Sequence, residues 1–410
     1  MARRYEKLCV ECGFCREEIL CPGVGKVGAA GEYESACVDC GVCYTACPYE
    51  AIGVVEDRLP RRHVKIFVEG EKFEVPERIT LRKALELVGM RFTKLPEGDS
   101  IYAPCETGGC YACAVAVDGE LKPLCTTPVR DGMRVELDVS EYTPLRIVSG
   151  FMPHTVGGVG TPWWVKRSGR YYVEVACFAH GCNLRCPQCQ NFSVTYGNAD
   201  RPLTPREAAG TLTYFRRKYG VDRMAISGGE PTLNRRWLVE FFRELRRLNR
   251  DERARLHLDT NATVLTRDYV DELVEVGMTD IGPDIKGLHV ETFMGITGIQ
   301  DRRLAESYLR NEWEITRYIV DHYYPDRVFI GVGIPYNSAL ITVEEVREMG
   351  ERLAGIDDEL QVCVLDYYGT FRRRDIGRPS YEEMLRVRQA LLEAGLKNVI
   401  AQTERGHVGP

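Results

Sequence analysis

From residue 171 to residue 410, short apolar runs alternate with longer stretches in which apolar positions repeat at helical spacing. The runs are 171–177, 223–227, 255–260, 280–285, 328–334 and 360–368, and with the helical stretches they make six strand–helix units. Such alternation favours parallel strands joined by helical crossovers. We therefore predict an α/β fold over residues 171–410, a partial (β/α)6 barrel whose chemistry lies in the loops after the strands.

The stretch from residue 61 to residue 145 has the pattern of short strands joined by tight turns. Its predicted elements are a hairpin over 63–75, a helix over 80–89, a second hairpin over 114–122 and a strand over 133–137. The hairpins turn at Glu69-Gly70 and Asp118-Gly119, dipeptides that suit tight turns. This region is predicted to fold as a separate small domain.

Residues 146–170 lose this periodicity and concentrate Gly, Pro, His and Trp, which predicts a connecting linker. Trp163 and Trp164 are unfavourable in water, so we expect them at a domain interface. His154, in the same stretch, is expected to make an ordinary hydrogen bond.

Two cysteine runs precede these regions. The first contains Cys9, Cys12, Cys15 and Cys21, and the second contains Cys37, Cys40, Cys43 and Cys47. The second run has the CxxCxxCxxxCP spacing that holds a 4Fe-4S cluster, whereas five residues precede Cys21 in the first. Residues 1–60 therefore resemble the bacterial two-cluster ferredoxins, with a pair of zinc knuckles as the alternative. The resemblance implies that Cys47 completes the cluster of the first run and that Cys21 completes the cluster of the second.

A third set has the spacing of plant-type 2Fe-2S ferredoxins, a gap of four residues, then two, then a distant fourth cysteine. Its members are Cys105, Cys110, Cys113 and Cys125. Together with the hairpins and helix, they make residues 61–145 resemble the β-grasp 2Fe-2S ferredoxins; a zinc ribbon is the alternative. Gly108 and Gly109 would let the backbone close around such a cluster.

The fourth set, Cys182, Cys186 and Cys189, follows the first predicted barrel strand. Three thiolates leave one iron of a 4Fe-4S cluster open. This CxxxCxxC loop resembles the radical S-adenosylmethionine (SAM) superfamily. In that family the amino and carboxylate groups of SAM bind the open iron, and reductive cleavage of SAM yields a 5′-deoxyadenosyl radical. The resemblance implies an enzyme that removes a hydrogen atom from a substrate, here unidentified: a protein that receives a glycyl radical, a peptide or a small molecule.

Further motifs carry the resemblance along the barrel. In "SGGEP", Gly228, Gly229 and Glu230 would bind the SAM ammonium group. "HLDTNAT" and "DIGPDIK" resemble the activating-enzyme branch, which includes pyruvate formate-lyase activating enzyme and the AmmeMemoRadiSam-type proteins. The residues implied by these motifs are Asp259, Thr260, Asn261 and Asp284, with a monovalent cation expected between Asp259, Thr260 and Asp284, and Lys286 at the SAM carboxylate. Ala262 and Gly282 depart from the pattern. Caps at strand ends are the alternative for the two aspartates.

The composition of the chain limits the kinds of partner and the cellular setting that we expect. The chain has a formal net charge of −6, which argues against a nucleic-acid binder, and no apolar run long enough for a signal peptide or a membrane span. A cytoplasmic, oxygen-free setting is expected, where its 17 cysteines serve as metal ligands rather than disulfides. Cys177 and Cys363, in apolar strands, are expected to be buried.

The expected cofactors are SAM, three 4Fe-4S clusters of which one binds SAM, one 2Fe-2S cluster and the monovalent cation. The expected partner is a low-potential electron donor of the ferredoxin or flavodoxin type, and the N-terminal clusters would relay its electrons to the barrel. Arg372, Arg373 and Arg374 could form an anion site. The alternative function is an iron–sulfur electron-transfer subunit of a larger oxidoreductase.

Overall fold

The computed structural model describes residues 1–23, 25–26, 36–58, 60–96, 98–155, 157–165 and 172–410. The chain forms two compact units. The first comprises Met1–Ser149, Ala179–Asn183 and Asn191–Thr204, and the second comprises Gly150–Phe178, Leu184–Gln190 and Pro205–Pro410. This division falls inside the fourth cysteine set: Cys182 belongs to the first unit, whereas Cys186 and Cys189 belong to the second.

The first unit begins with short elements built around the two ferredoxin-like runs. They are β1 (Ala2–Arg4), α1 (Phe14–Glu17), β2 (Leu20–Cys21), β3 (Gly25–Lys26), α2 (Val42–Ala46) and β4 (Ile52–Val54). Strands β1 and β4 pair antiparallel, as do β2 and β3. Each short helix starts directly after a CxxCG sequence, at Gly13 and at Gly41, so the two runs fold in the same way locally.

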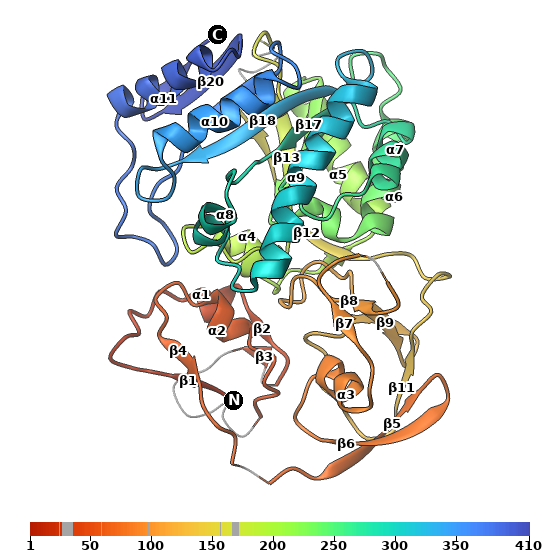
Figure 1. Cartoon of the computed structure of the whole chain (residues 1–410). Helices are drawn as coiled ribbons and strands as arrows, with labels where there is room; N and C mark the ends of the chain where they lie inside the picture. Colours follow the sequence, from red (N-terminus) through yellow and green to blue (C-terminus); the bar gives the residue numbers. More distant parts are fainter. Residues whose placement is uncertain (24, 27–35, 59, 97, 156, 166–171) are drawn as a thin grey trace. The chain divides into compact units, whose positions relative to one another are not determined.

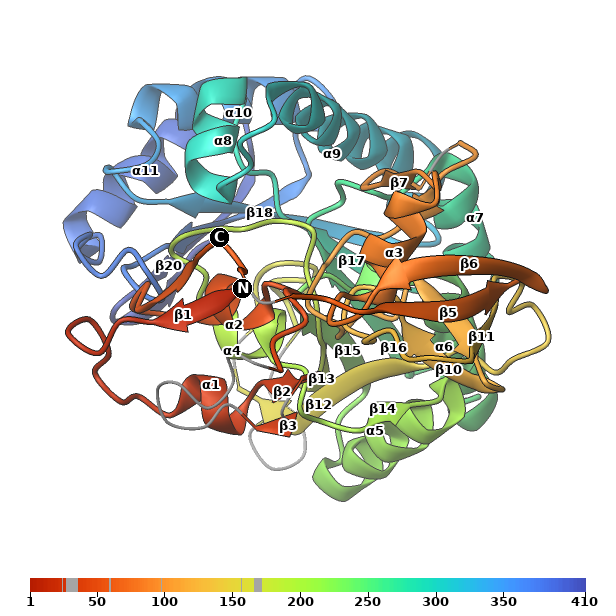
Figure 2. The same cartoon turned by 90° about the horizontal axis from the view of Figure 1, so that it is seen from below.

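A five-stranded sheet in the order β10-β9-β11-β5-β6 follows in the same unit. Its elements are β5 (His63–Val68), β6 (Glu71–Pro76), α3 (Leu81–Leu87), β9 (Ala114–Val117), β10 (Glu120–Pro123) and β11 (Met133–Glu136), with a small pair β7 (Phe92–Thr93) and β8 (Ile101–Tyr102). Figure 2 shows the β5–β6 hairpin with β11 beside it. The Thr80 hydroxyl caps α3 by accepting the Lys83 N–H at 3.2 Å. Both predicted hairpins, the helix and the last strand are confirmed.

A sheet of mostly parallel strands makes up most of the second unit, although residues 146–149, 179 and 202–203 of the sheet belong to the first unit. The ten-stranded order is β14-β12-β13-β15-β16-β17-β18-β19-β20-β21. Its members are β12 (Arg146–His154), β13 (Glu174–Ala179), β14 (Pro202–Leu203), β15 (Arg223–Gly228), β16 (Arg255–Thr260), β17 (Asp280–Pro283), β18 (Phe329–Tyr336), β19 (Gln361–Asp366), β20 (Asn398–Thr403) and β21 (Gly406–Val408). From β15 to β20 each strand pairs parallel with the next, as expected for a partial barrel.

Helices connect these strands and lie on their outside in Figure 1. They are α5 (Pro205–Tyr219), α6 (Arg235–Leu248), α7 (Arg267–Glu275), α8 (Val290–Thr297), α9 (Arg302–Tyr323), α10 (Val343–Ala354) and α11 (Tyr381–Glu393), while α4 (Phe192–Tyr196) belongs to the first unit. Side-chain caps start several of them; Thr342, for example, accepts the Glu345 N–H at 3.1 Å. Six of the seven barrel helices were expected from the apolar spacing, and α8 was not.

One expectation is wrong. Residues 146–154 form the nine-residue strand β12 and not a linker, because its backbone pairs in the sheet despite Gly150 and Pro153. Strand β20 is a parallel strand beyond the six predicted, and its short run "NVIAQT" has only weak alternation. The rings of Trp163 and Trp164 pack edge to face on each other, and their place at a domain interface stays a prediction. Tyr171, which begins the first predicted strand, lies outside the described residues.

No helix among the described residues is both long and apolar enough to cross a bilayer.

Candidate functional site

The structure sorts the eight N-terminal cysteines into two sets. One cavity is lined by Cys9, Cys12, Cys15 and Cys47, together with residues around them. Cys43 has Cys40, Cys21 and Cys37 as its nearest charged neighbours. These are the two sets that the ferredoxin resemblance implies. Backbone N–H groups point at the sulfurs, as from Ala51 to Cys47 at 3.3 Å, so this donor set suits an iron–sulfur cluster.

The third set lies in the β-grasp domain, where all four thiols are buried. Hydrogen bonds from Cys110 and Cys125 hold the pKa of Cys105 well below that of an ordinary thiol. Backbone N–H groups of Thr107 and Ala112 donate to Cys105 and Cys110 at 3.5 and 3.4 Å. Four converging thiols with amide donors fit a 2Fe-2S cluster, because thiolates are the ligands and N–H donors stabilise their charge.

The fourth set occupies the loop after β13, at the carboxyl ends of the parallel strands. In the second unit, the 184–190 part of this loop is held by two elements. The Arg185 N–H donates to Thr297 O at 2.8 Å, and the Gln188 side chain donates to Ile296 O at 2.7 Å, both at the end of α8. The backbone N–H groups of Arg372 and Arg373 both donate to Pro187 O, at 2.9 and 3.1 Å.

These contacts give the arginine segment a role that the sequence did not reveal. Arg372 and Arg373 support the cluster loop through their main chain, and the Arg373 side chain pairs with Asp375 at 2.9 Å. An anion site at Arg372, Arg373 and Arg374 stays a prediction. The sequence also carried a signal for α8, which is the "GITG" segment at its C-terminus. Gly298 of this segment caps the helix, and its backbone lies against the Arg185 carbonyl.

Lys286 lies beside the cluster loop, almost fully buried. Its Nζ is 3.3 Å from Asp284 Oδ2, and its backbone N–H donates to Glu312 Oε1 at 3.0 Å. Burial disfavours the charged ammonium, but Asp284, Cys186 and Glu312 outweigh burial and raise the pKa of Lys286. Burial raises the pKa of the Cys186 thiol to about 12, and Cys189 adds to this while Lys286 opposes it. Lys286 is therefore a positive charge near Cys186, one of the three cysteines.

Glu230 has a different environment from the one expected at the SAM ammonium. The side chain is fully buried and accepts from the Thr232 N–H and hydroxyl at 2.9 and 2.6 Å, from the Thr260 hydroxyl at 2.8 Å and from the Asn261 N–H at 2.6 Å. Glu230 thus ties the end of β15 to the turn after β16. Its contact with SAM, and those of Gly228 and Gly229, stay predictions.

The residues expected at the monovalent cation are brought to adjacent strand ends. Asp284 N–H donates to Thr260 O at 2.9 Å, and Asp259 lies opposite Gly282 in the β16–β17 pairing. The Thr260 hydroxyl, however, donates to Glu230 and accepts the Ala262 N–H at 2.9 Å, so one of its two lone pairs is already used. The cation site therefore stays a prediction.

A cavity of about 430 Å³ lies inside the barrel. Its lining combines three carboxylates, three histidines and one thiol with glycines and small polar groups: His154, Gly157, Gly158, Val159, Glu174, Ser227, His257, Asp259, Asp284, Cys363, Leu365, Gln402, Thr403, Gly406 and His407. Cys177 and Cys363 are buried as expected, and Cys363 also faces this cavity. The described lining residues include no lysine or arginine.

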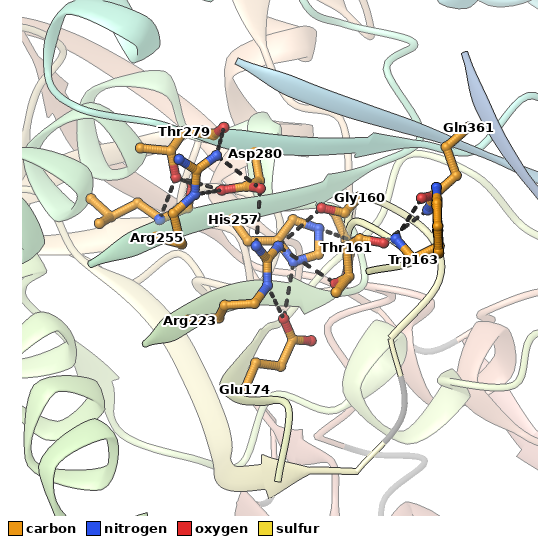
Figure 3. Close-up of polar contacts among 12 residues, drawn as sticks. Gly160, Thr161, Trp163, Glu174, Arg223, Arg255, His257, Thr279, Asp280 and Gln361 are labelled. Atoms are coloured by element: carbon orange, nitrogen blue, oxygen red, sulfur yellow. Dashed lines mark hydrogen bonds and ion pairs between the residues drawn. The ribbon is translucent and has the colours of Figure 1, made fainter. Parts of the chain in front are cut away.

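Residues 157–163, here called the plug, lie at the amino end of the barrel. Gly157, Gly158 and Val159 of the plug line the cavity. Gln361 donates to Gly158 O and Thr161 O at 2.6 and 2.8 Å and accepts the Trp163 N–H at 2.8 Å. Arg223 donates to Gly160 O at 3.0 Å, and Figure 3 shows these contacts. The plug therefore fills the amino end of the barrel, opposite the cysteine loop of β13.

Arg223 and Gln361, which bond to the plug, are the first residues of β15 and β19. The buried charges next to Arg223 also begin strands. Arg223 lies 3.0 Å from Asp280 and 3.7 Å from Glu174, and Arg255 lies 2.9 Å from Asp280. Burial alone would raise the pKa of Asp280, but the two guanidinium groups keep it below its ordinary value. The sequence contained a signal for this cluster, since each of these strands begins with a charged residue.

His257 links this buried cluster to the cavity. Its Nδ1 is 3.2 Å from Glu174 and its Nε2 is 3.0 Å from Asp259. Burial disfavours the imidazolium, but the carboxylates of Asp259 and Glu174 outweigh burial and raise the pKa of His257 to about 10. His257 is therefore charged at neutral pH.

The pKa of His257 gives a pH dependence to the stability of the barrel. A raised pKa stabilises the fold fully below the ordinary value of 6.5, and this stabilisation is lost as the pH rises through about 10. We expect the free energy of unfolding to fall between pH 7 and pH 10 more steeply in the wild type than in His257→Gln. All four tryptophans lie in the second unit, so tryptophan fluorescence during denaturant unfolding measures this transition. Equal slopes for the two proteins would contradict the prediction.

Comparison with known proteins gives three matching family models. Residues 177–353 match the radical SAM superfamily, residues 61–139 match a 2Fe-2S iron–sulfur cluster binding domain, and residues 32–53 match a 4Fe-4S binding domain. Residues 177–353, 61–139 and 32–53 are therefore similar to a radical SAM domain, a 2Fe-2S binding domain and a 4Fe-4S binding domain.

The relatives in this superfamily vary in activity. The chain is 32% identical over 117 residues to a probable GTP 3′,8-cyclase of Methanococcus aeolicus, covering 28% of this chain and 38% of the relative. It is 33% identical over 136 residues to an AdoMet-dependent heme synthase of Methanosarcina barkeri, covering 30% and 35%. The chain thus spans little more than a third of the length of these relatives. A solved structure of Streptococcus suis SuiB bound to S-adenosylmethionine has a TM-score of 0.38 and 15% identity, covering 54% of this chain and 44% of that one. These comparisons do not select the activating-enzyme branch.

Proposed function

We propose that this radical SAM protein reductively cleaves SAM and uses the resulting 5′-deoxyadenosyl radical to take a hydrogen atom from a substrate in the barrel cavity. The observation that carries the proposal is the position of Lys286 and Asp284, which lie near Cys186 while Asp284 also lines the cavity. Bound SAM and its cluster would supply the radical chemistry. The chain's own residues bind, orient and enclose the reactants.

The lining of the cavity supports a neutral or cationic substrate, either a small molecule or one residue of a peptide. Glu174, Asp259 and Asp284 face the cavity, and an oligophosphate there would meet like charges with no described basic partner in the lining. This weighs against the triphosphate that the name of the cyclase relative specifies. The "DTN" and "DIK" motifs support an activating-enzyme role, in which the residue would belong to a partner protein.

The N-terminal cysteine sets support an electron relay. Their ligand spacing suits 4Fe-4S clusters, a cluster type that reaches low potentials, and reductive cleavage needs a low-potential electron. We propose that a ferredoxin- or flavodoxin-type protein reduces this domain.

The first experiment uses the anaerobically reconstituted full chain. With dithionite and SAM, 5′-deoxyadenosine is expected as a product, quantified by chromatography against protein of known iron content. A protein with full iron content that forms none would overturn the proposal and favour an electron-transfer subunit.

Lys286 provides a second prediction. Replacement of Lys286 by methionine is expected to weaken SAM binding about ten- to hundred-fold, since a hydrogen bond to a charged group contributes about 1.5–3 kcal/mol. Burial already raises the pKa of Glu312 well above its usual value, so Glu312 can stay neutral when the lysine is removed. Equilibrium binding of SAM to the reconstituted variant measures the change.

Lys286→Arg serves as the matched control, because it keeps the charge and should lose less affinity. Unchanged SAM affinity in Lys286→Met, with complete clusters, would show that Lys286 does not contact SAM.

A further inference from the structure

The 2Fe-2S loop and the start of the SAM-cluster loop are in direct contact within the first unit. A Cβ added at Gly109 would lie 2.7 Å from His180 Cβ and 3.1 Å from Gly181 N. A Cβ added at Gly181 would lie 3.0 Å from Cys105 Cβ and 3.1 Å from Cys110 Cβ. The backbone of Gly181 therefore touches two ligands of the predicted 2Fe-2S cluster, and Gly181 is bonded directly to Cys182.

Hydrogen bonds fix this contact from both sides. The Ile147 N–H donates to Gly109 O at 3.1 Å, and Ile147 O accepts the His180 N–H at 3.0 Å. The buried Arg146 side chain donates to His180 O at 3.1 Å. Ile147 of β12 thus bonds to both the 2Fe-2S loop and the SAM-cluster loop. These hydrogen bonds hold the two loops in contact.

The histidine in this contact is also fixed. His180 Nδ1 lies 2.9 Å from Gly197 O, and His180 Nε2 lies 2.7 Å from the Ser149 hydroxyl. Its main chain therefore has little freedom to move away from Gly109.

A second approach joins the 2Fe-2S loop to the N-terminal sets. One cavity of about 490 Å³ is lined by both Cys40 and Cys125, with Asp39, Arg82 and Glu106 around them. Cys40 belongs to the set with Cys21, Cys37 and Cys43, and Cys125 belongs to the 2Fe-2S set. The 2Fe-2S set therefore shares one cavity with a 4Fe-4S set, and two of its cysteines touch Gly181, the residue before Cys182.

From these contacts we infer that the 2Fe-2S centre is the last carrier before the SAM cluster, and that electrons cross at the Gly109–Gly181 junction. This rests on the proposed function and assigns the order of its relay. With the clusters bound, the Cys40 set and the Cys125 set would hold the carriers through which single electrons from the external low-potential donor reach the cluster held by Cys182. No bond forms or breaks at the junction. Gly109 and Gly181 are positioning residues, since any side chain there would push the two loops apart.

The experiment counts electrons that the relay can deliver. The full chain is reduced with dithionite under anaerobic conditions, excess reductant is removed, and SAM is added. The wild type is expected to form more 5′-deoxyadenosine than the electron of the SAM cluster alone accounts for. Cys113→Ala, which removes a 2Fe-2S ligand, should lose this surplus although its 4Fe-4S clusters remain reduced. A surplus equal to that of the wild type would overturn the inferred order.

The same variant separates this inference from the proposed function. When dithionite is left in the reaction, it can reduce the SAM cluster directly, so Cys113→Ala should still form 5′-deoxyadenosine. Absence of product in the wild type under these conditions is instead a failure of the proposed function.

A spectroscopic readout tests the junction without relying on product. In reduced wild-type protein, the SAM cluster should speed the spin relaxation of the 2Fe-2S signal, seen as a higher microwave power at half-saturation. Cys186→Ala should lower that power, whereas Cys12→Ala, in the 4Fe-4S set that does not line the cavity with Cys125, should not. The opposite pattern would overturn the inference.

Gly109→Ala tests the contact itself. Its added methyl group meets main-chain and Cβ atoms of residues 180 and 181, so the surplus product should appear at least several-fold more slowly while both clusters keep their spectra. Gly210→Ala, on α5 with nothing within 4 Å of its added Cβ, is the matched control and should behave as the wild type. Equal rates for Gly109→Ala and the wild type would contradict the junction.

Discussion

Replacement of Cys186 by alanine is expected to abolish the formation of 5′-deoxyadenosine. Cys186 is one of three cysteines in the loop after β13, and no described residue of that loop offers another thiolate in its place. Two cysteines cannot hold a cluster in which three irons need a protein ligand. We therefore expect loss of product to the detection limit, together with the loss of one cluster's iron and of its electron paramagnetic resonance signal.

Cys177→Ala is the matched control for this result. Cys177 is fully buried in β13, close in sequence to the loop, and its thiol donates to Ala225 O at 3.7 Å. Removal of a small buried thiol should affect packing but leave the cluster and the product in place. If Cys186→Ala keeps full activity, or if both variants lose it equally with intact clusters, the assignment of the loop is wrong.

Replacement of Arg223 by methionine is expected to lower the free energy of unfolding of the barrel by about 3–5 kcal/mol, the usual effect of removing one partner from a buried ion pair. Asp280 and Glu174 would both lose a buried partner, and Gly160 O in the plug would lose a donor. Denaturant unfolding followed by tryptophan fluorescence measures the change in this unit.

The pH dependence distinguishes charge from packing as the cause. The guanidinium group keeps the pKa of Asp280 low, so in the variant Asp280 should protonate at a higher pH, and the loss of stability should shrink as the pH falls. Arg243→Met provides the control, because Arg243 pairs with Glu240 on the exposed face of α6 and should change stability by only about 0–1 kcal/mol. A pH-independent loss, or a loss no greater than in the control, would contradict this account.

Much of the fold could be predicted because its elements carry strong local patterns. The β5–β6 hairpin follows from alternation around Glu69-Gly70, and α6 follows from apolar positions at helical spacing. The family models confirm the radical SAM, 4Fe-4S and 2Fe-2S domains that the cysteine spacings indicated.

The remaining features depend on contacts between residues far apart in the sequence. The hydrogen bonds from the Arg372 and Arg373 main chain to Pro187 O do not depend on side-chain type, so no sequence pattern predicts them. The four donors around Glu230 could not be predicted from its motif, and its contact with SAM stays a prediction. Strand β12 was missed because pairing in a sheet can override the weak strand tendency of a segment with Gly and Pro.

The plug has a consequence for the order in which the protein folds during synthesis. Residues 157–163 precede in the chain every strand that they contact, from Arg223 in β15 to Gln361 in β19. Because a chain emerges from the ribosome from its N-terminus, the plug is present before the barrel exists, and the strands must assemble around it. The contact between Gly158 and Gln361, 203 residues apart, can form only after most of the barrel has left the ribosome, so barrel closure is a late event in translation.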